Sequence, residues 1–141
     1  MLTINKHFVL FVVADPAACR DFYVDHFGFE VEIDVGWYVV VTSGSERPMG
    51  LGFLQAGHPT QPARHCQPTA GSRFITFEVD DVDPIAAELV AAGLDVDVPL
   101  GDEPWGQRHL IVRDPAGNGV DIVQNIAPDR EFARQWFKMT A

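Results

Sequence analysis

Hydrophobic and polar residues follow the same order twice along the chain. The first copy reads FVVADPAACRDFYVDHFGFEV, and the second reads FITFEVDDVDPIAAELVAAGLDV. In each copy an apolar run ends at an aspartate, Asp15 or Asp80, and a helical pattern ends thirteen residues later at Gly28 or Gly93. The offset between copies is 65 residues, which is longer than the period of about 20–50 residues of solenoid repeats. We therefore expect two similar halves.

The first half is expected to form a strand, a helix and three more strands. His7 to Val13 is apolar almost without interruption, as in a strand that is buried on both faces. Asp15 is placed to cap the helix that follows, and Gly28 suits the left-handed backbone position that ends a helix. The three later strands are expected at residues 29–33, 37–42 and 49–54.

The second half repeats this order and adds a terminal helix. Its hairpin turn is Asp114-Pro115-Ala116-Gly117-Asn118, which has the residue types of tight turns. Before the hairpin, a strand, a helix and a strand are expected at residues 73–79, 82–92 and 94–98. A last helix is expected at residues 128–141, and its apolar side consists of Phe132, Trp136 and Phe137.

This element order predicts an α+β fold made of two βαβββ modules with mixed sheets. The linker contains three prolines and no hydrophobic period, and it is long enough to cross the molecule. The expected divisions are a first module at 1–56, a linker at 57–72, a second module at 73–126 and a C-terminal helix at 127–141. A chain of 141 residues can bury its core as one compact domain.

The charge of the chain narrows the classes of partner. The formal net charge is −10, which argues against nucleic acid. Glu78 to Glu103 contains nine carboxylates and no lysine or arginine. Such a run is either a solvated surface or a field that attracts cationic small molecules.

Composition also bears on the location of the protein. The longest apolar runs are shorter than the roughly 18 residues that a membrane-spanning helix needs, so no membrane partner is expected. The N-terminal residues do not have the pattern of a signal peptide. Two cysteines, Cys19 and Cys66, are too few for a disulfide framework. We therefore expect a cytoplasmic protein.

Three segments carry a resemblance to a known family. They are FVVADPAACRDFYVDHFGFEV, EVDDVDPIAAELVAAG and PWGQRHLIVRDPAGNGVDIVQ, and together they span about residues 5–125. Through them the chain resembles the vicinal oxygen chelate superfamily, the group of glyoxalases, bleomycin-resistance proteins and extradiol dioxygenases. The resemblance implies open sheets that curl around a cleft, and many members pair their modules across a dimer. Because such sheets leave apolar edges and the terminal helix adds apolar surface, we expect a homodimer.

Enzymes of that superfamily hold a divalent metal in the cleft, where open positions polarise substrate oxygens. The resemblance assigns two of the ligand positions to Phe8 and Phe74, which have no ligating atom. A third position falls on Asp121, which can ligate a metal, and Gln55 is the only ligating residue near the fourth. The resemblance is therefore to the metal-free branch, and we expect no metal and no cofactor.

The histidines and cysteines leave alternatives open. His109 lies on a predicted strand near the cleft and is the only histidine expected to contribute to a site. Cys19 falls on the apolar side of the first helix, and Cys66 falls in the linker. Neither cysteine belongs to a motif that supplies a histidine and an acid.

The favoured hypothesis is a small-molecule-binding protein that sequesters an aromatic compound, cationic or neutral, as antibiotic-resistance members of the family do. Phenylalanines in place of ligands make the cleft apolar and suited to flat rings. Asp121 and Glu78 are the candidate partners of a positive charge. The residues expected to line the cleft are Phe8, Trp37, Phe53, Phe74, Glu78, Trp105, His109 and Asp121.

Two other classes of function stay open. One is an enzyme, either a lyase, isomerase or dioxygenase with displaced metal ligands, or a metal-independent acid–base catalyst that uses Asp121 or Glu78 with His109. The other is an interaction module that binds a protein through its terminal helix. Resemblance of fold alone does not separate these classes.

Overall fold

The computed structural model describes residues 2–3, 6–46, 48–68, 71 and 73–137. The chain divides into two compact units, Met1–Ala70 and Gly71–Ala141, called unit 1 and unit 2 below. Each unit contains one four-stranded mixed sheet and one helix packed on it. The expected α+β fold of two βαβββ modules is confirmed. The boundaries of the linker, and the packing of both modules into one domain, stay predictions.

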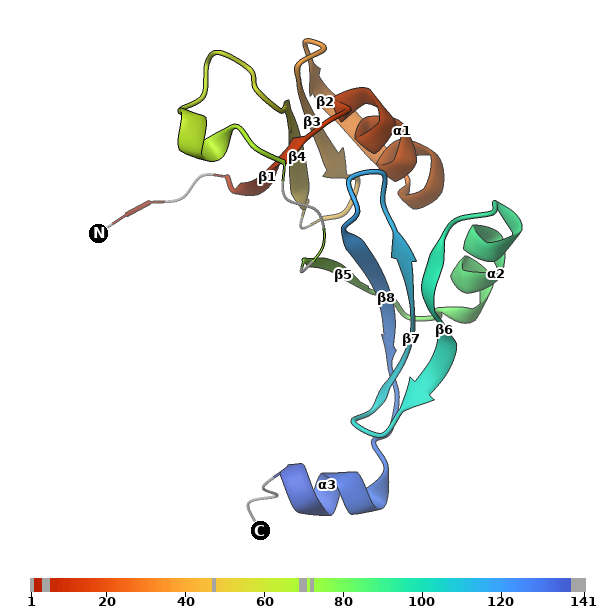
Figure 1. Cartoon of the computed structure of the whole chain (residues 1–141). Helices are drawn as coiled ribbons and strands as arrows, with labels where there is room; N and C mark the ends of the chain where they lie inside the picture. Colours follow the sequence, from red (N-terminus) through yellow and green to blue (C-terminus); the bar gives the residue numbers. More distant parts are fainter. Residues whose placement is uncertain (1, 4–5, 47, 69–70, 72, 138–141) are drawn as a thin grey trace. The chain divides into compact units, whose positions relative to one another are not determined.

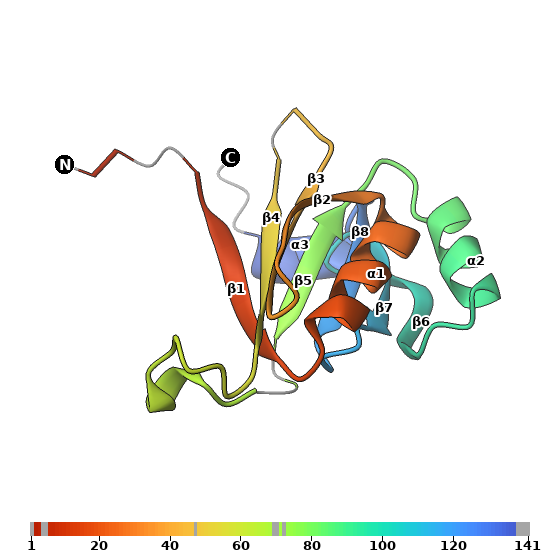
Figure 2. The same ribbon diagram turned by 90° about the horizontal axis from the view of Figure 1, so that it is seen from above.

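Unit 1 is a sheet in the strand order β1-β4-β3-β2 (Figure 1). Strands β1 and β4 are parallel, and the other neighbours are antiparallel. Helix α1 lies along one face of this sheet (Figure 2). The elements are β1 (Phe8–Val13), α1 (Pro16–Phe27), β2 (Phe29–Asp34), β3 (Tyr38–Ser43) and β4 (Gly50–Gln55).

The predicted ends of α1 are confirmed by its capping contacts. The Asp15 carboxylate accepts a hydrogen bond from the Ala18 N–H at 3.0 Å, which satisfies one of the unpaired donors of the first turn. Gly28 ends the helix with φ at 65°, a backbone conformation that costs glycine little. Local sequence therefore decides where α1 begins and ends.

Strand β1 differs from its prediction. Phe11 and Val13 are buried on the α1 side, but Phe8, Val9 and Leu10 are exposed. An apolar run was expected to be buried on both faces. Only one face of this sheet lies under a helix, so Phe8 and Leu10 on the other face keep apolar surface accessible. Val9 shares the face of Phe11 but is 56% exposed near the start of the strand.

Unit 2 repeats the topology with the strand order β5-β8-β7-β6. Strand β5 pairs with β8 in parallel, and the hairpins β6–β7 and β7–β8 are antiparallel. Helix α3 follows β8 at the end of the sheet where β6 turns into β7 (Figure 1). The elements are β5 (Phe74–Glu78), α2 (Asp83–Ala91), β6 (Val96–Glu103), β7 (Gln107–Arg113), β8 (Gly119–Asn125) and α3 (Arg130–Trp136).

Two elements of unit 2 have different bounds from those expected. Strand β6 continues to Glu103 instead of ending at residue 98, because two shifts of register carry it past Pro99 in its pairing with β7. Helix α3 ends at Trp136, and the last residues of its prediction, 138–141, lie outside the described part.

The segment between β4 and β5 folds back on itself where the structure describes it. It contains a short 3₁₀ helix, Ala63–His65, and the Gly57 N–H donates to the Cys66 carbonyl at 2.9 Å. The Cys66 thiol points at the Gln61 carbonyl, 3.1 Å away. Residues 57–66 therefore form a closed loop in place of an extended spacer. Cys19 is buried in the core of unit 1, as expected.

Candidate functional site

The candidate site lies on the helix-free face of unit 2, which is the side of the sheet opposite α2. The Arg108 side chain reaches Asp83 of α2, so Arg108 points to the helix side of β7. Side chains alternate along a strand, and His109 therefore points to the helix-free face. The β7–β8 and β5–β8 registers place Asp121, Thr76 and Phe74 on the same face.

His109 is held between two carboxylates. Its Nδ1 lies 2.7 Å from Asp121 Oδ1, and its Nε2 lies 3.4 Å from Glu103 Oε1. His109 is only 8% exposed, so these polar contacts form largely away from water, where hydrogen bonds are stronger. Three strands, β6, β7 and β8, each supply one member of this cluster, which we call the His109 cluster: Glu103, His109 and Asp121.

Trp105 lies beside the cluster, in the turn between β6 and β7. Its ring meets the His109 ring edge-on, with centroids 6.4 Å apart. The indole N–H donates to Gln107 Oε1 at 2.7 Å, which fixes the ring in the turn. Trp105 keeps 41% of its surface exposed, so an indole face is accessible next to buried polar groups.

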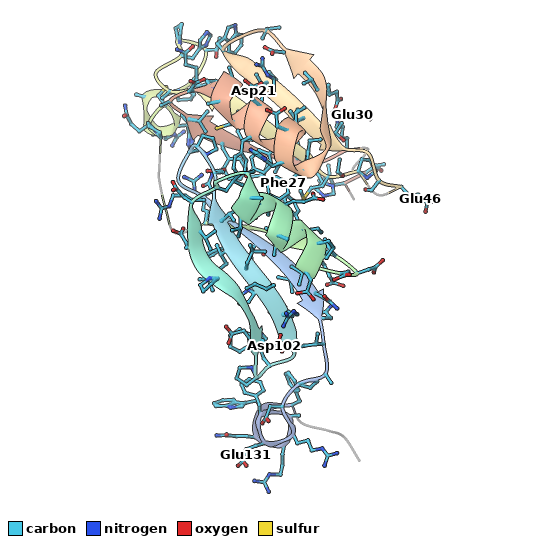
Figure 3. The ribbon with its side chains drawn as sticks, turned by 90° about the vertical axis from the view of Figure 1, so that its right-hand side faces the viewer. Asp21, Phe27, Glu30, Glu46, Asp102 and Glu131 are labelled. Atoms are coloured by element: carbon cyan, nitrogen blue, oxygen red, sulfur yellow. The ribbon has the colours of Figure 1, made fainter. Side chains whose placement is uncertain are left out.

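The turn that carries Trp105 is fastened to the segment leading into α3. The Ile126 N–H donates to the Gly106 carbonyl, and the Asp129 N–H donates to the Pro104 carbonyl, both at 2.9 Å. Phe132 of α3 packs on Trp105 with centroids 6.4 Å apart. Figure 3 shows the labelled residues Asp102 and Glu131 at this end of unit 2. The terminal helix thus belongs to the surroundings of the site.

Gly106 is the residue that permits this approach. Its φ of 98° lies in the region that favours glycine, and a Cβ there would lie 2.8 Å from the Ile126 carbonyl oxygen. A side chain would therefore meet backbone atoms. The close passage of the chain over the turn requires glycine at this position.

Phe74 and Glu78 lie on β5 of the same face. The Phe74 ring fills the space beside Gly119, because a Cβ on that glycine would lie 2.5 Å from the ring. Phe74 is 65% exposed and offers aromatic surface. Glu78, at the end of β5, is exposed and is separate from the hydrogen bonds of the His109 cluster.

The helix-free face of unit 1 is apolar at the corresponding place. Phe8 lies over Gly50 and Gly52 of β4, where added Cβ atoms would be 2.8 Å and 3.2 Å from it. Leu10 covers Gly52 beside it, with its Cδ1 atom 2.7 Å from the same added Cβ. Phe8 and Leu10 are 40% and 41% exposed. The two phenylalanines of the sequence prediction thus occupy like positions, each over a glycine of the paired parallel strand.

Two of the aromatic residues predicted for the cleft have other surroundings. Phe53 is completely buried and stacks on Tyr23 of α1, with centroids 5.6 Å apart. It faces the helix, so the expectation that Phe53 lines a cleft is wrong. Trp37 stacks on His58 at 3.8 Å and is half-buried. One indole face of Trp37 is therefore covered by its own chain.

Glu103 is the member of the His109 cluster that sequence reasoning did not select. It was counted only as part of the acidic run, because the strand was expected to end five residues earlier. The signal was the symmetric hairpin around Pro104-Trp105-Gly106, which pairs Glu103 with Gln107. A longer β6 would have placed Glu103 beside the candidate histidine.

The basic residues around the cluster are engaged elsewhere. Arg108 bonds to Asp102 and Asp83, and these hydrogen bonds, the one to Asp102 first, raise its pKa. Arg113 bonds to Asp97, and this contact raises the pKa of Arg113. Within the described ranges, Glu103 has no ion pair with a lysine or an arginine.

The residues present do not fit the divalent metal that the family resemblance brings with it. Two ligand positions carry phenylalanine side chains, which donate no lone pair, and these rings occupy the space beside their strands. Among residues 2–3, 6–46, 48–68, 71 and 73–137, no group of three or more His, Cys, Asp or Glu is arranged to hold a metal ion. In the same ranges, no helix has the length and apolarity needed to span a bilayer.

Comparison with known protein families shows that one family model matches most of the chain. The model of the Glyoxalase/Bleomycin resistance protein/Dioxygenase superfamily matches residues 6–122. No curated protein matches the chain.

Several solved structures share the fold. TioX from Micromonospora sp. ML1 is 26% identical with a TM-score of 0.67, over 86% of this chain and 100% of that one. TnmS3, an antibiotic binding protein from Streptomyces sp. CB03234, is 27% identical with a TM-score of 0.65, over 89% and 98%. Lactoylglutathione lyase from Agrobacterium tumefaciens is 23% identical with a TM-score of 0.64, over 86% and 94%. The last likeness shows the fold alone.

Proposed function

Because the chain belongs to the glyoxalase/bleomycin resistance protein/dioxygenase superfamily, we propose that it binds and sequesters a small aromatic molecule, cationic or neutral, without a bound metal and without turnover. The observation that carries this proposal is the pair Phe8 and Phe74. Each is a partly exposed ring at a position that the family resemblance gives to a metal ligand. Aromatic side chains stack on flat ligands and coordinate no metal.

Further support comes from the face around Phe74 and from one similar protein. Trp105 offers an exposed indole face, and carboxylates nearby suit a ligand with positive charge. TnmS3, which has the same fold, is described as an antibiotic binding protein. The residues proposed for ligand contact are Phe8 and Trp37 in unit 1, and Phe74, Glu78, Trp105, His109 and Asp121 in unit 2.

The proposal is tested with a panel of planar aromatic compounds, each in a cationic and a neutral form. We expect saturable quenching of tryptophan fluorescence, a raised melting temperature, and recovery of the compounds unchanged by mass spectrometry. Elemental analysis of protein prepared without chelator should find less than a stoichiometric amount of divalent metal. About one metal ion per chain, or conversion of a bound compound, would contradict the proposal.

The second candidate function is proton transfer. The partly buried contact between His109 and Asp121, at 2.7 Å, is the arrangement that orients a histidine as a general base. Its test is turnover: product formation that disappears in His109→Asn but persists in Glu88→Gln, an exposed position on α2, would favour catalysis over sequestration.

We also propose that the protein acts as a homodimer in the cytoplasm. Trp136 and Phe137 of the terminal segment are 64% and 45% exposed, and apolar surface of this kind is often covered by a second subunit. Light scattering should give about twice the chain mass of 15.6 kDa. A mass of one chain at micromolar concentration would reject the dimer.

A further inference from the structure

We propose that Glu103 and His109 form a subsite for a primary amino group of the ligand. This inference rests on the proposed function, because it says which chemical group of a bound aromatic molecule reaches the His109 cluster. It changes the role expected of Asp121. Asp121 orients the histidine, and the cation is taken by Glu103 and the second nitrogen of the imidazole.

The argument begins with the hydrogen bond between His109 and Asp121. An ionised carboxylate has only acceptor atoms, so the proton in the 2.7 Å contact belongs to His109 Nδ1. In a neutral imidazole the other nitrogen, Nε2, then carries a lone pair. Asp121 therefore selects the tautomer of His109.

The second contact of His109 joins two atoms that can both only accept a hydrogen bond when the ring is neutral and Glu103 is ionised. Nε2 lies 3.4 Å from Glu103 Oε1, and neither atom has a proton to give the other when the ring is neutral and the acid ionised. Glu103 is paired with no lysine or arginine in the described ranges. With a neutral ring, the pair lacks a donor and a positive charge, and this neutral tautomer is the premise of the proposal.

A primary ammonium group supplies both. It has three N–H donors on one atom, so it can donate to Nε2 and to the Glu103 carboxylate at once, and hydrogen bonds between charged groups are the stronger ones. A hydroxyl has one donor and no charge, and a quaternary ammonium has charge and no donor. The acceptor pair thus distinguishes among these three groups.

The approach to the subsite is on the Glu103 side. The Glu103 side chain is 30% exposed, whereas that of His109 is 10% exposed. Trp105 is 41% exposed beside His109, and its N–H is already used by Gln107. The amino group can therefore reach the pair while the aromatic part of the ligand lies on the indole.

The test uses three probes that share one naphthalene ring: 2-naphthylmethylammonium, its N,N,N-trimethyl form and 2-naphthalenemethanol. Their dissociation constants are measured by calorimetry with the full chain. We expect the primary ammonium to bind at least about 10-fold more tightly than either analogue. Equal binding of all three would overturn the subsite and leave aromatic sequestration standing. A lack of binding by all three would overturn both proposals.

Two variants distinguish binding at the subsite from attraction of the cationic probe by the overall negative charge of the protein. Glu103→Gln should raise the dissociation constant of the primary ammonium about 10-fold and that of the alcohol less than about 2-fold. Glu88→Gln is the matched control, because it makes the same change of charge on α2, at the opposite side of the sheet, and should alter no affinity. Equal losses for both variants would show that only the field of the protein attracts the probe, and would overturn the subsite.

Nuclear magnetic resonance of the imidazole tests the premise without a ligand. Nitrogen-15 spectra near neutral pH should show His109 with a proton on Nδ1 and a lone pair on Nε2, with the signal identified by its loss in His109→Asn. Addition of the primary ammonium should shift Nε2, and the alcohol should not. A proton on Nε2 in the unliganded protein would mean that the imidazole already satisfies Glu103, and the proposal would be wrong.

Discussion

The two units have one topology and differ on their helix-free faces. In unit 1 this face carries the apolar side chains of Phe8 and Leu10, both partly exposed, over the glycines of β4. In unit 2 the same kind of face carries the His109 cluster. A repeated backbone therefore determines where side chains point, and the residue at each point decides between dispersion contacts and hydrogen bonds. The repeat predicts geometry, and it does not predict chemistry.

The common feature of the two faces is the aromatic ring beside a glycine. Phe8 pairs with Gly50, and Phe74 pairs with Gly119. The missing side chain leaves room for the ring on the sheet. What differs is the next residue pair on the same face: Leu10 and Gly52 in unit 1, and Thr76 and Asp121 in unit 2. We infer that the face of unit 1 suits apolar contact, whereas the face of unit 2 suits polar recognition.

The largest expected effect is a loss of stability on removing a core ring of unit 1, compared with a ring on its helix-free face. Phe53→Ala should lower the free energy of unfolding by about 3–5 kcal/mol, because it empties a fully buried site between Phe11 and Tyr23. Phe8→Ala, at a 40% exposed position, should cost about 1 kcal/mol. Urea denaturation measures both. Similar losses of unfolding free energy in both variants would contradict the assignment of Phe53 to the core and Phe8 to the exposed face.

A smaller loss of stability is expected at the turn of unit 2. Gly106→Ala should cost about 1–3 kcal/mol, because φ is 98° and the new Cβ would meet the Ile126 carbonyl. Gly101→Ala in the adjacent strand is the control, because its nearest heavy atom would be 3.8 Å away. Thermal unfolding gives the comparison, and proteolysis should cut the segment before α3 faster in Gly106→Ala only. Equal stability of the two variants would contradict the tight approach.

Substitution of one tryptophan in each unit compares how much each unit contributes to the affinity for aromatic ligands. Trp105→Ala should weaken aromatic ligands roughly 10-fold at any salt concentration, as loss of a stacking partner does. Trp37→Ala should have a smaller effect, because His58 already covers one of its faces at 3.8 Å. Calorimetry with the naphthalene probes decides between them. A larger loss for Trp37→Ala would move the main aromatic contact to unit 1.

The smallest expected effect is a pH dependence of stability in unit 1. Asp34 accepts a hydrogen bond from the Gly36 N–H at 2.9 Å and pairs with Arg20. These contacts, the backbone one first, lower the pKa of Asp34 below its ordinary value of 3.8. A lowered carboxyl pKa stabilises the fold above the ordinary value, and this stabilisation is lost as pH falls through the lowered pKa.

Asp34→Asn should therefore be less stable than the natural chain at neutral pH, and the difference should shrink on acidification below about 3.8. Urea midpoints across the acid range measure it, with Asp21→Asn on α1 as the control. Figure 3 shows Asp21 on that helix, where it pairs with the same arginine. A difference that stays constant down to acid pH would contradict the assignment.

The sequence by itself determined the order of elements and most of their ends. Asp15 and Gly28 bound α1 through local hydrogen bonds and one left-handed backbone position, and such effects need only neighbouring residues. The period of the apolar residues and the repeat likewise predicted two βαβββ modules. His109 was a candidate from its predicted strand near the cleft, and Asp121 from the family resemblance; the acid–base hypothesis grouped them, but the sequence did not predict their hydrogen bond.

Tertiary structure decided which side chains meet. Alternation along a strand says that Phe53 and its neighbours point to opposite sides, but only the packing of α1 shows that Phe53 is on the core side. Glu103 reaches His109 because register shifts carry β6 past Pro99, and a shift of one residue exchanges the faces of all side chains beyond it. Contacts between strands depend on register, and register depends on residues that are distant in the sequence.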